Sequence, residues 1–394
     1  PREIVARPDL GHAGHRRHDE GLHVAECGTR SGRVRGGTRS GRVRGGARPS
    51  ENARPRRPYD AGVLTLGWKA SAEQFGPSEL LELAVLAEER GFDSIVVSDH
   101  FHPWRDTDGH APFSFAWLGA ASQRTRRARL GTSVVCPSFR YHPAIVAQAM
   151  ATLGGLAPGR VFLGVGSGEA MNEVVVTAAE WPSPGERLHR LREAIELIRK
   201  LWSGDYVTHD GTYFRTRGAK IFDKPAAPVP LLVAAGGPKA AELAGELGDG
   251  VIVTSGKGDE LYRDTLIPAV ERGIRASGRD PARIERMIEM KVSFDPDRER
   301  ALADTREWAA LALPEEQKRG VEDPREMERR SSEAAGRAHT RFIVSNDPDE
   351  VVEGIRPYIG LGFTHLVLHL PGRDQRRSIE LAAKEVLPRL RKIS

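Results

Sequence analysis

The chain alternates between short apolar runs of β type and longer segments in which apolar residues recur every three or four positions. Residues 63–70 (VLTLGWKA) predict a strand, and residues 78–91 predict a helix that ends at a glycine. Further strands are predicted at 94–100, 128–135, 161–169, 230–237, 251–256, 287–294, 341–345 and 365–370. Further helices are predicted at 142–157, 185–202, 238–249, 260–276, 347–362 and 376–392. Strands that alternate with helices are typical of a parallel α/β fold.

Two segments interrupt this alternation. Residues 205–218 predict a β-hairpin, because Asp210 and Gly211 between β-type residues favour a tight turn. Residues 297–333 predict a charged helical insertion. The remaining eight or nine strands favour a (β/α)8 TIM barrel over an open doubly wound sheet, with residues 58–394 as one catalytic domain. The segment GVGSGE (164–169) has only part of a G-x-G-x-x-G spacing, so it is poor evidence for NAD binding.

Residues 1–57 differ in composition from the rest. They hold 14 Arg against 6 acidic residues, whereas the other 45 basic residues are outnumbered by 48 acidic ones. They also contain a tandem repeat, RSGRVRGGT followed by RSGRVRGGA. Such a composition cannot bury enough apolar surface to offset ordering entropy, so we expect a disordered leader without function. The alternative is a nucleic-acid-binding tract, but no aromatic residue interleaves the arginines.

Cysteine content and hydropathy bear on the compartment. Cys27 and Cys136 form no disulfide framework, which fits a reducing cytoplasm. No apolar run approaches the roughly 18–20 residues that span a bilayer, and the start of the chain lacks the apolar region of a secretory signal. No spacing of zinc, calcium or iron ligands is present. We expect a cytoplasmic protein with no bound metal and no membrane partner.

Polar residues follow the second and fourth predicted strands. His100 comes after Ser98 and Asp99, and a histidine beside a carboxylate at a strand end can act as a general base. Glu169 follows a glycine-rich strand end, and we expect it opposite His100 across the barrel mouth. His100, Glu169 and the nearby Trp104 each have a structural alternative. His100 can form hydrogen bonds within its own loop, the Trp104 ring can pack in the core, and Glu169 can interact favourably with a helix dipole.

The residues that follow two later predicted strands can bind anions. Gly236 and Gly237 precede a helix that begins near Pro238, whose free amides can bind a phosphate, although a simple tight turn is the alternative. Thr254 and Lys257 offer a hydroxyl and an ammonium at the sixth strand end. Lys318 and Arg341 can join them, but spacing alone does not separate them from solvated surface residues.

The chain resembles the coenzyme F420-dependent glucose-6-phosphate dehydrogenases of the bacterial luciferase-like superfamily. The matching stretches run in order from about residue 62 to the end and include LGWKASAEQF (66–75), VSDHFHPWR (97–105), DGHAPFS (108–114), LGTSVVCPSFRYHPA (130–144), RVFLGVGSGEAMNEV (160–174), AAGGPKAAELAGELGDG (234–250), TSGKGDELY (254–262), MIEMKVSFDPD (287–297), EEQKRGVEDPREME (315–328) and PGRDQRR (371–377). The resemblance implies a homodimeric barrel that binds F420, a deazaflavin, and oxidises glucose 6-phosphate at C1 to 6-phosphogluconolactone.

The resemblance also implies roles for individual residues. His100, Glu169 and Trp104 match the catalytic residues, with the acid and base assignment of the first two left open. The positions that match cofactor contacts are Asp99, Ser133, Val134, Cys136, Ser167, Gly168, Asn172, Gly236, Gly237, Lys239 and Ala240. The bond between Ser133 and Val134 matches a non-prolyl cis peptide. The positions that match the substrate phosphate pocket are Thr254, Lys257, Lys318 and Arg341.

Three residues depart from the family pattern. Cys136 and Ser167 each replace a threonine, and only Ser167 keeps the hydroxyl. Arg319 replaces a histidine beside Lys318. The first change removes a hydroxyl contact to the cofactor, and none removes a catalytic group. Two related readings stay open: a deazaflavin enzyme for another alcohol, and an FMN-dependent monooxygenase of the same superfamily.

Overall fold

The computed structural model describes residues 63–225 and 227–393. The predictions for the leader, disorder and lack of function, lie outside the described residues and stay predictions. So does the predicted domain boundary between residues 57 and 58.

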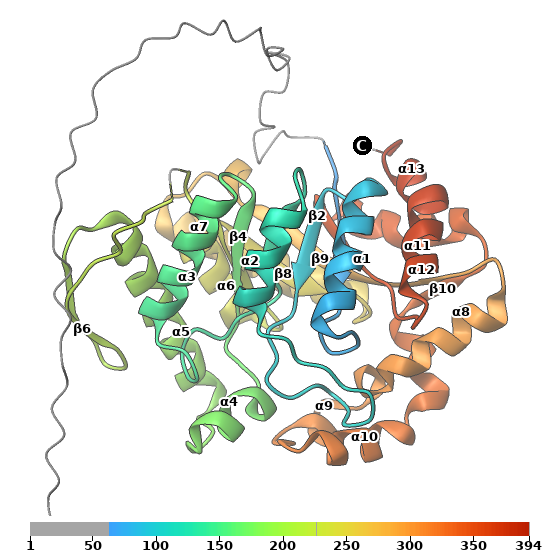
Figure 1. Cartoon of the computed structure of the whole chain (residues 1–394), viewed down its shortest axis with the longest axis horizontal. Coiled ribbons are helices and arrows are strands. Elements are labelled where there is room, and N and C mark those ends of the chain that lie inside the picture. The colour runs from blue at the N-terminus through green and yellow to red at the C-terminus, as the bar shows by residue number, and fades with distance from the viewer. Residues whose placement is uncertain (1–62, 226, 394) are drawn as a thin grey trace, which may run out of the picture. The chain divides into compact units, whose positions relative to one another are not determined.

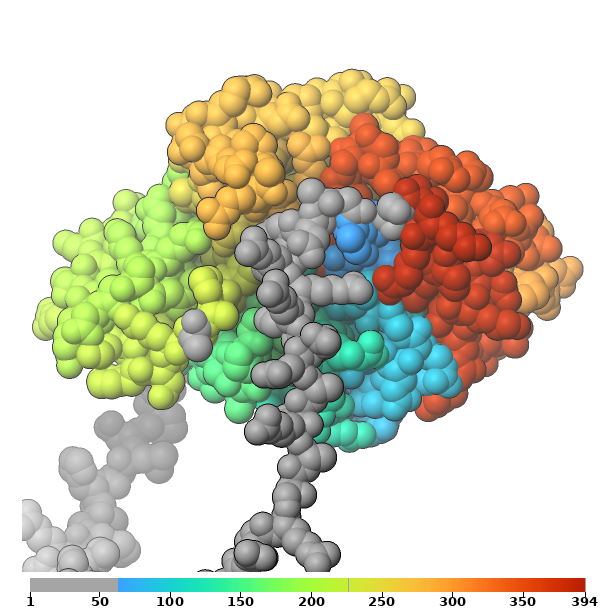
Figure 2. All heavy atoms as spheres, turned by 90° about the horizontal axis from the view of Figure 1, so that it is seen from above, coloured from blue at the N-terminus to red at the C-terminus, as the bar shows by residue number. Residues whose placement is uncertain are grey.

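Eight parallel strands close into a barrel. Their order around it is β1 (Thr65–Ala70), β2 (Ser94–Val97), β3 (Arg129–Thr132), β4 (Val161–Val165), β7 (Leu231–Ala234), β8 (Gly250–Thr254), β9 (Glu285–Phe294) and β11 (His365–His369). β11 pairs with β1 and closes the circle, with Thr65 opposite His365. Seen from above, the colours run around the molecule from cyan through green and yellow-orange to red (Figure 2). The predicted (β/α)8 barrel is therefore confirmed.

Helices surround the strands (Figure 1). They are α1 (Pro77–Glu89), α2 (Ser114–Arg124), α3 (Pro143–Leu156), α4 (Ala170–Thr177), α5 (Pro184–Ser203), α6 (Pro238–Leu247), α7 (Ile267–Ser277), α11 (Pro348–Gly360), α12 (Gln375–Leu381) and α13 (Leu387–Leu390). Sequence patterns did not predict α2. Its N-cap residue is Phe113, which supplies no capping side chain, and its first turn holds no acid, so the usual start signals are missing.

The segments outside the regular alternation also form as predicted, with one exception. Strands β5 (Val207–Asp210) and β6 (Arg215–Ala219) make the antiparallel hairpin. The insertion after β9 is helical, with α8 (Arg298–Asp304), α9 (Glu315–Lys318) and α10 (Pro324–Ser332). The predicted strand at 341–345 is shorter, β10 (Ile343–Ser345), and it extends the sheet from β9 without entering the barrel.

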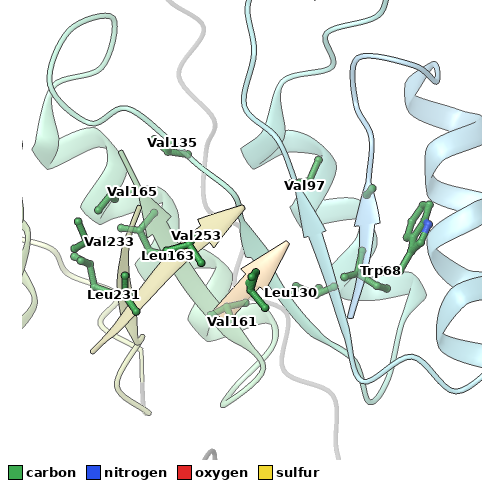
Figure 3. Close-up of a cluster of buried hydrophobic side chains, with 14 of the residues drawn as sticks. Trp68, Val97, Leu130, Val135, Val161, Leu163, Val165, Leu231, Val233 and Val253 are labelled. Atoms are coloured by element: carbon green, nitrogen blue, oxygen red, sulfur yellow. The ribbon is translucent and has the colours of Figure 1, made fainter. Parts of the chain in front are cut away.

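Alternate residues on each strand face the helices or the barrel interior. Outward residues such as Leu163 on β4 and Val233 on β7 pack in the layer under the helices (Figure 3). Six buried side chains fill the middle of the interior: Val96, Phe162, Leu232, Ile252, Met287 and Val367. This apolar layer separates two polar layers, one toward each end of the barrel.

The polar layer at the amino ends of the strands is fully paired. Glu285 binds Arg129 through two bonds of 2.8 and 3.0 Å, and its Oε1 lies 2.6 Å from Nδ1 of His365. The other ring nitrogen of His365 lies 2.6 Å from Oγ of Ser94. Burial alone would raise the pKa of Glu285, but Arg129 and His365 outweigh it and hold that pKa far below its usual range. This end therefore stabilises the fold.

Candidate active site

His100 lies at the carboxyl end of β2 beside a buried carboxylate. Its Nδ1 is 3.4 Å from Oε1 of Glu73, which follows β1, and Oγ of Ser98 donates to the other Glu73 oxygen at 2.7 Å. Burial would raise the pKa of Glu73, yet the charges of His100 and Lys69 and the bond from Ser98 lower it overall. At neutral pH a carboxylate therefore faces the histidine, which suits a general base whose protonated form needs a counter-charge.

Lys69 extends this charged group across the barrel interior. Its ammonium lies 3.4 Å from Oε2 of Glu289 on β9 and donates to the carbonyl of Ser133 at 3.0 Å. Nδ1 of His369 on β11 lies 3.4 Å from the other Glu289 oxygen. Both ring nitrogens of His369 are buried without a hydrogen-bond partner within the described residues, as is Nδ1 of His100. Burial opposes ionisation of Glu289, but Lys69 and His369 keep its pKa well below the usual value.

A second buried group fixes the loops around His100. Arg140 donates to the carbonyl and the carboxylate of Asp99 at 2.5 and 2.6 Å, and its Nε lies 3.3 Å from Glu173. Asp99 also accepts from Ser114 at 2.6 Å and from Tyr141 at 3.2 Å. Burial raises the pKa of Glu173 to about 6 despite Arg140. Asp99 is 3% exposed, and its three partners anchor the end of the strand.

Asn172 links His100's loop to Glu169. Its Oδ1 accepts from the amides of Phe101 and His102 at 2.8 and 3.2 Å, and its amide nitrogen donates to Glu169 at 3.3 Å. The expectation that Glu169 lies opposite His100 is wrong. Strands β2 and β4 are separated only by β3 in the barrel, so the two side chains come from one side of the mouth.

Trp104 sits between His100 and the helical insertion. Its ring stacks with that of His100 at a centroid distance of 6.4 Å and an interplanar angle of 18°. It also packs on an apolar cluster formed by Met171, Ala310, Leu313, Val321, Met327 and Ala334, most of which belongs to the insertion. Its Nε1 is buried without a hydrogen-bond partner in the described part of the chain. The Trp104 side chain therefore packs against the insertion and at the same time stacks on His100.

The carboxyl ends of β3 and β4 lie close together, and the chain after β3 pairs with β4 through Val135 and Val165. The peptide bond between Ser133 and Val134 is cis, as the resemblance implied. Gly168 has φ +84°, and a Cβ there would lie 2.8 Å from Sγ of Cys136. Cys136 itself is 4% exposed, and burial raises its pKa to about 12, so it is a protonated, packed thiol. Ser167 lies beside Gly168 and is partly exposed.

The next strand end presents open backbone. Gly236 and Gly237 follow β7, and a Cβ built on either would meet no atom within 4 Å. Gly237 is the N-cap of α6 and has no side-chain cap, so the first amides of this ten-residue helix are available. Lys239 and Ala240 lie in its first turn. Together with the ends of β2, β3 and β4, this makes one contiguous, glycine-rich half of the mouth.

The other half of the mouth is cationic. Thr254 ends β8, and partial burial together with the charges of Arg341 and Lys318 lowers the pKa of Lys257. Lys318 is 3.6 Å from Glu315 in the insertion, and Nε of Arg341 is buried without a hydrogen-bond partner within the described residues. The four residues predicted for a phosphate pocket are therefore brought together, although they come from three separate segments.

Sequence reasoning missed the residues that complete these groups. They are Lys69, Glu73, Arg140, Glu173, Glu289, Lys291 and His369. Glu73 lies in the loop after β1, within a stretch that matches the family but to whose acid the resemblance assigned no role. The strand residues are single polar positions in apolar runs; their period-two spacing, such as Glu285, Glu289 and Lys291 on β9, is the signal that could have placed them in the interior.

Two further classes of site are not found in residues 63–225 and 227–393. No group of three or more His, Cys, Asp or Glu is placed to hold a metal ion. No helix there has the length and apolar character to cross a membrane.

Comparison with known proteins agrees with this geometry. Residues 62–365 match the model of the luciferase-like monooxygenase family. A curated relative from Beutenbergia cavernae named F420-dependent glucose-6-phosphate dehydrogenase is 59% identical over 84% of this chain and 98% of its own. Relatives of the same name from Nakamurella multipartita and Mycolicibacterium smegmatis are 56% and 55% identical, over 83% and 84% of this chain and 97% and 99% of their own.

Solved structures point the same way. An F420-dependent secondary alcohol dehydrogenase in complex with an F420–acetone adduct superposes with a TM-score of 0.79 at 37% identity, covering 83% of this chain and 99% of its own. The F420-dependent tetrahydromethanopterin reductase from Methanopyrus kandleri, 23% identical, shares the fold with a TM-score of 0.70 over 84% of this chain and 100% of its own. The chain belongs to the luciferase-like family, and within it to the group whose curated members are named F420-dependent glucose-6-phosphate dehydrogenase.

Proposed function

We propose that the protein oxidises glucose 6-phosphate at C1 with coenzyme F420 as the acceptor, giving 6-phosphogluconolactone and reduced F420. The observation that carries the substrate is the cationic half of the mouth, where Lys257, Lys318 and Arg341 converge. Cations held close together repel one another, and a phosphate ester relieves that repulsion. The relatives' names support the same substrate and cofactor.

The glycine-rich half of the mouth fits a deazaflavin. The open space before Gly236 and Gly237 admits a ligand close to the backbone, and the start of α6 suits its anionic part. The residues that would hold the cofactor are Asp99, Ser133, Val134, Cys136, Ser167, Gly168, Asn172, Gly236, Gly237, Lys239 and Ala240. When bound, F420 supplies the hydride acceptor.

His100 removes the proton from the anomeric hydroxyl while the hydride leaves C1. The C1–H bond breaks, the C1=O bond of the lactone forms, and the proton moves to the imidazole. Glu73, 3.4 Å from Nδ1, stabilises the imidazolium that results. Trp104 shields the positive charge that develops at C1. We assign to Glu169, on the loop after β4, the handling of a proton on the cofactor side.

Three finer properties stay proposals: a homodimer, a cytoplasmic location and a place in carbohydrate metabolism. The first and third rest on the resemblance. The second is supported by Cys136, which is a free, buried thiol.

The test is spectroscopic. Purified protein is mixed with F420 and glucose 6-phosphate, and the deazaflavin absorbance is followed, with FMN and NAD in place of F420 as controls. We expect loss of absorbance with F420 and no reduction of FMN or NAD. Turnover with FMN, or no turnover with F420 while it is bound, would overturn the proposal.

A further inference from the structure

Lys291 is a buried cation that nothing in the sequence singles out. It lies on β9, two residues after Glu289, so both side chains face the barrel interior. It is 2% exposed, and it is among the largest fully buried side chains of the described chain. A buried lysine is costly unless it is paired or has a use, so its contacts are informative.

The backbone amide and the ammonium of Lys291 both donate to Ser255, which lies beside two residues of the predicted phosphate pocket. The Lys291 amide donates to Oγ of Ser255 at 2.9 Å, and its ammonium donates to the Ser255 carbonyl at 3.2 Å. The Ser255 amide in turn donates to the Glu289 carbonyl at 2.9 Å. Ser255 stands between Thr254 and Gly256-Lys257, so β9 holds the segment that carries two of the four predicted phosphate contacts.

Gly256, which follows Ser255, packs closely against the backbone of Arg341. Gly256 has φ +79°, and a Cβ there would lie 2.7 Å from the carbonyl oxygen of Arg341. The segment after β8 is therefore packed between Lys291 on one side and the Arg341 backbone on the other. A shift of Ser255 would displace Lys257 and Arg341 together.

The charges around Lys291 are mostly positive. Arg341 after the insertion, Lys257 after β8 and Lys69 on β1 all face it, and His369 on β11 lies in the same layer. The carboxylate that faces it is Glu289, which also serves Lys69. Burial, together with Arg341, Lys257 and Lys69, lowers the pKa of Lys291 to about 8 against the opposing effect of Glu289. A dianion in the pocket would offset this excess of positive charge.

We propose that Lys291 is a positioning residue for the substrate phosphate. It fixes the Thr254–Lys257 segment through Ser255, and its buried charge adds to the positive potential that binds the phosphate. This rests on the proposed function and names a specificity determinant for it. A buried charge is screened by salt far less than a surface lysine, so Lys291 contributes at physiological ionic strength.

The first test compares Lys291→Met with Lys291→Arg, each loaded with F420. We expect the methionine variant to raise KM for glucose 6-phosphate about tenfold or more, with kcat and F420 affinity close to wild type. The arginine variant keeps the charge and should recover at least part of the loss. Unphosphorylated glucose should be used equally by all three. A methionine variant that melts at the wild-type temperature with unchanged KM, or one that loses glucose and glucose 6-phosphate turnover alike, would overturn the proposal.

The second test is a pH profile. Because the pKa of Lys291 is about 8, its charge is present below that pH and is lost above it, so KM of the wild type should rise between pH 7.5 and 9. Arginine stays charged throughout, so Lys291→Arg should show a weaker rise. An identical rise in both proteins would assign the titration to Lys257 and contradict the role of the Lys291 charge.

A binding measurement separates this inference from the proposed function. Inorganic phosphate is titrated calorimetrically into wild type and Lys291→Met. Weaker binding by the variant supports the inference even if glucose 6-phosphate is not turned over. Equal binding overturns the inference alone, whereas no binding by the wild type overturns the phosphate pocket and the inference together.

Discussion

The two polar layers of the barrel interior use the same kinds of residue and have opposite characters. At the amino ends of the strands, Glu285, Arg129, His365 and Ser94 bind one another at 2.6–3.0 Å. At the carboxyl ends, the ion pairs of Lys69, Glu289 and His369 are 3.4 Å long. Polar atoms of five residues near the mouth (Ser71, His100, Trp104, Arg341 and His369) are buried without hydrogen-bond partners in the described chain, and the Nδ1 atoms of the two histidines reach a carboxylate only at 3.4 Å.

This difference separates a stabilising layer from a functional one. Buried polar groups are normally satisfied, because each unsatisfied group costs about 1–3 kcal/mol. A cluster of unsatisfied groups at one end of a barrel therefore marks the place where a ligand supplies the missing contacts. The functional end is also the carboxyl end, where (β/α)8 enzymes place their sites.

The largest effect is expected from removing the base at the functional end. His100→Ala should lower kcat by about 10²–10⁴, the usual worth of general-base catalysis, and leave F420 affinity unchanged. Steady-state kinetics and F420 fluorescence titration measure the two quantities. His209→Ala is the matched control, since His209 pairs with Glu193 at 3.2 Å far from the mouth and should retain full activity. Wild-type turnover by His100→Ala would remove His100 as the base.

A substitution in the polar layer at the amino ends of the strands should lower the stability of the fold and leave the kinetic constants unchanged. Glu285→Gln should lower the free energy of unfolding by about 3–5 kcal/mol, because it removes the buried charge that pairs with Arg129 and His365, with KM unchanged. Glu380→Gln, which breaks the exposed pair with Arg90, should cost less than about 1 kcal/mol. Urea denaturation gives both values. Equal losses in the two variants would refute the stabilising role.

The same variant has a predicted pH dependence. The folded pKa of Glu285 is lowered, so its stabilisation is present above the unfolded pKa of about 4.3 and is lost as pH falls below it. Burial also lowers the pKa of His365 despite Glu285, so protonation of the unfolded chain below about 6.5 reduces stability further. Below about pH 4, wild type should therefore lose stability more steeply than Glu285→Gln, which has no carboxyl to protonate at this position; urea denaturation at a series of pH values measures both slopes.

Arg341→Ala probes the cationic half of the functional end. Loss of a partner for the phosphate should cost about 2–5 kcal/mol, which is roughly a 30- to 4,000-fold rise in KM for glucose 6-phosphate. F420 affinity should not change. Arg215→Ala removes an exposed arginine of the hairpin, paired with Asp210, and should leave KM as it is. An unchanged KM in Arg341→Ala would take Arg341 out of the pocket.

The smallest effect tests the glycine-rich half. Gly237→Val adds a side chain where a Cβ meets nothing within 4 Å, so the melting temperature should hold while F420 affinity falls about tenfold, or about 1.4 kcal/mol. Gly155→Val on α3, where a Cβ also meets nothing, should leave affinity intact. A valine at position 237 that binds F420 normally would move the cofactor elsewhere.

Much of this molecule could be predicted from its sequence. Strand and helix periods gave the barrel, and the resemblance placed His100, Trp104 and the phosphate residues at its mouth. The helix α2 was missed because Phe113 gives no capping signal. Glu73 and Lys69 were missed because their importance comes from proximity: Glu73 acts on His100, 27 residues later, and Lys69 meets Glu289 only when the barrel closes. The predicted position of Glu169 was wrong although strand order follows sequence order here: only β3 separates β2 from β4, which is too few strands to put the two residues on opposite sides of an eight-stranded barrel.

The most direct test of the functional end is the ratio of kcat/KM for glucose 6-phosphate to that for glucose, measured with F420 as the acceptor. A pocket built from Lys257, Lys318 and Arg341 predicts a ratio of at least about 30, equivalent to about 2 kcal/mol of phosphate binding. A ratio near one would contradict the assignment of the cationic half to a phosphate, and would leave a barrel that oxidises some other alcohol.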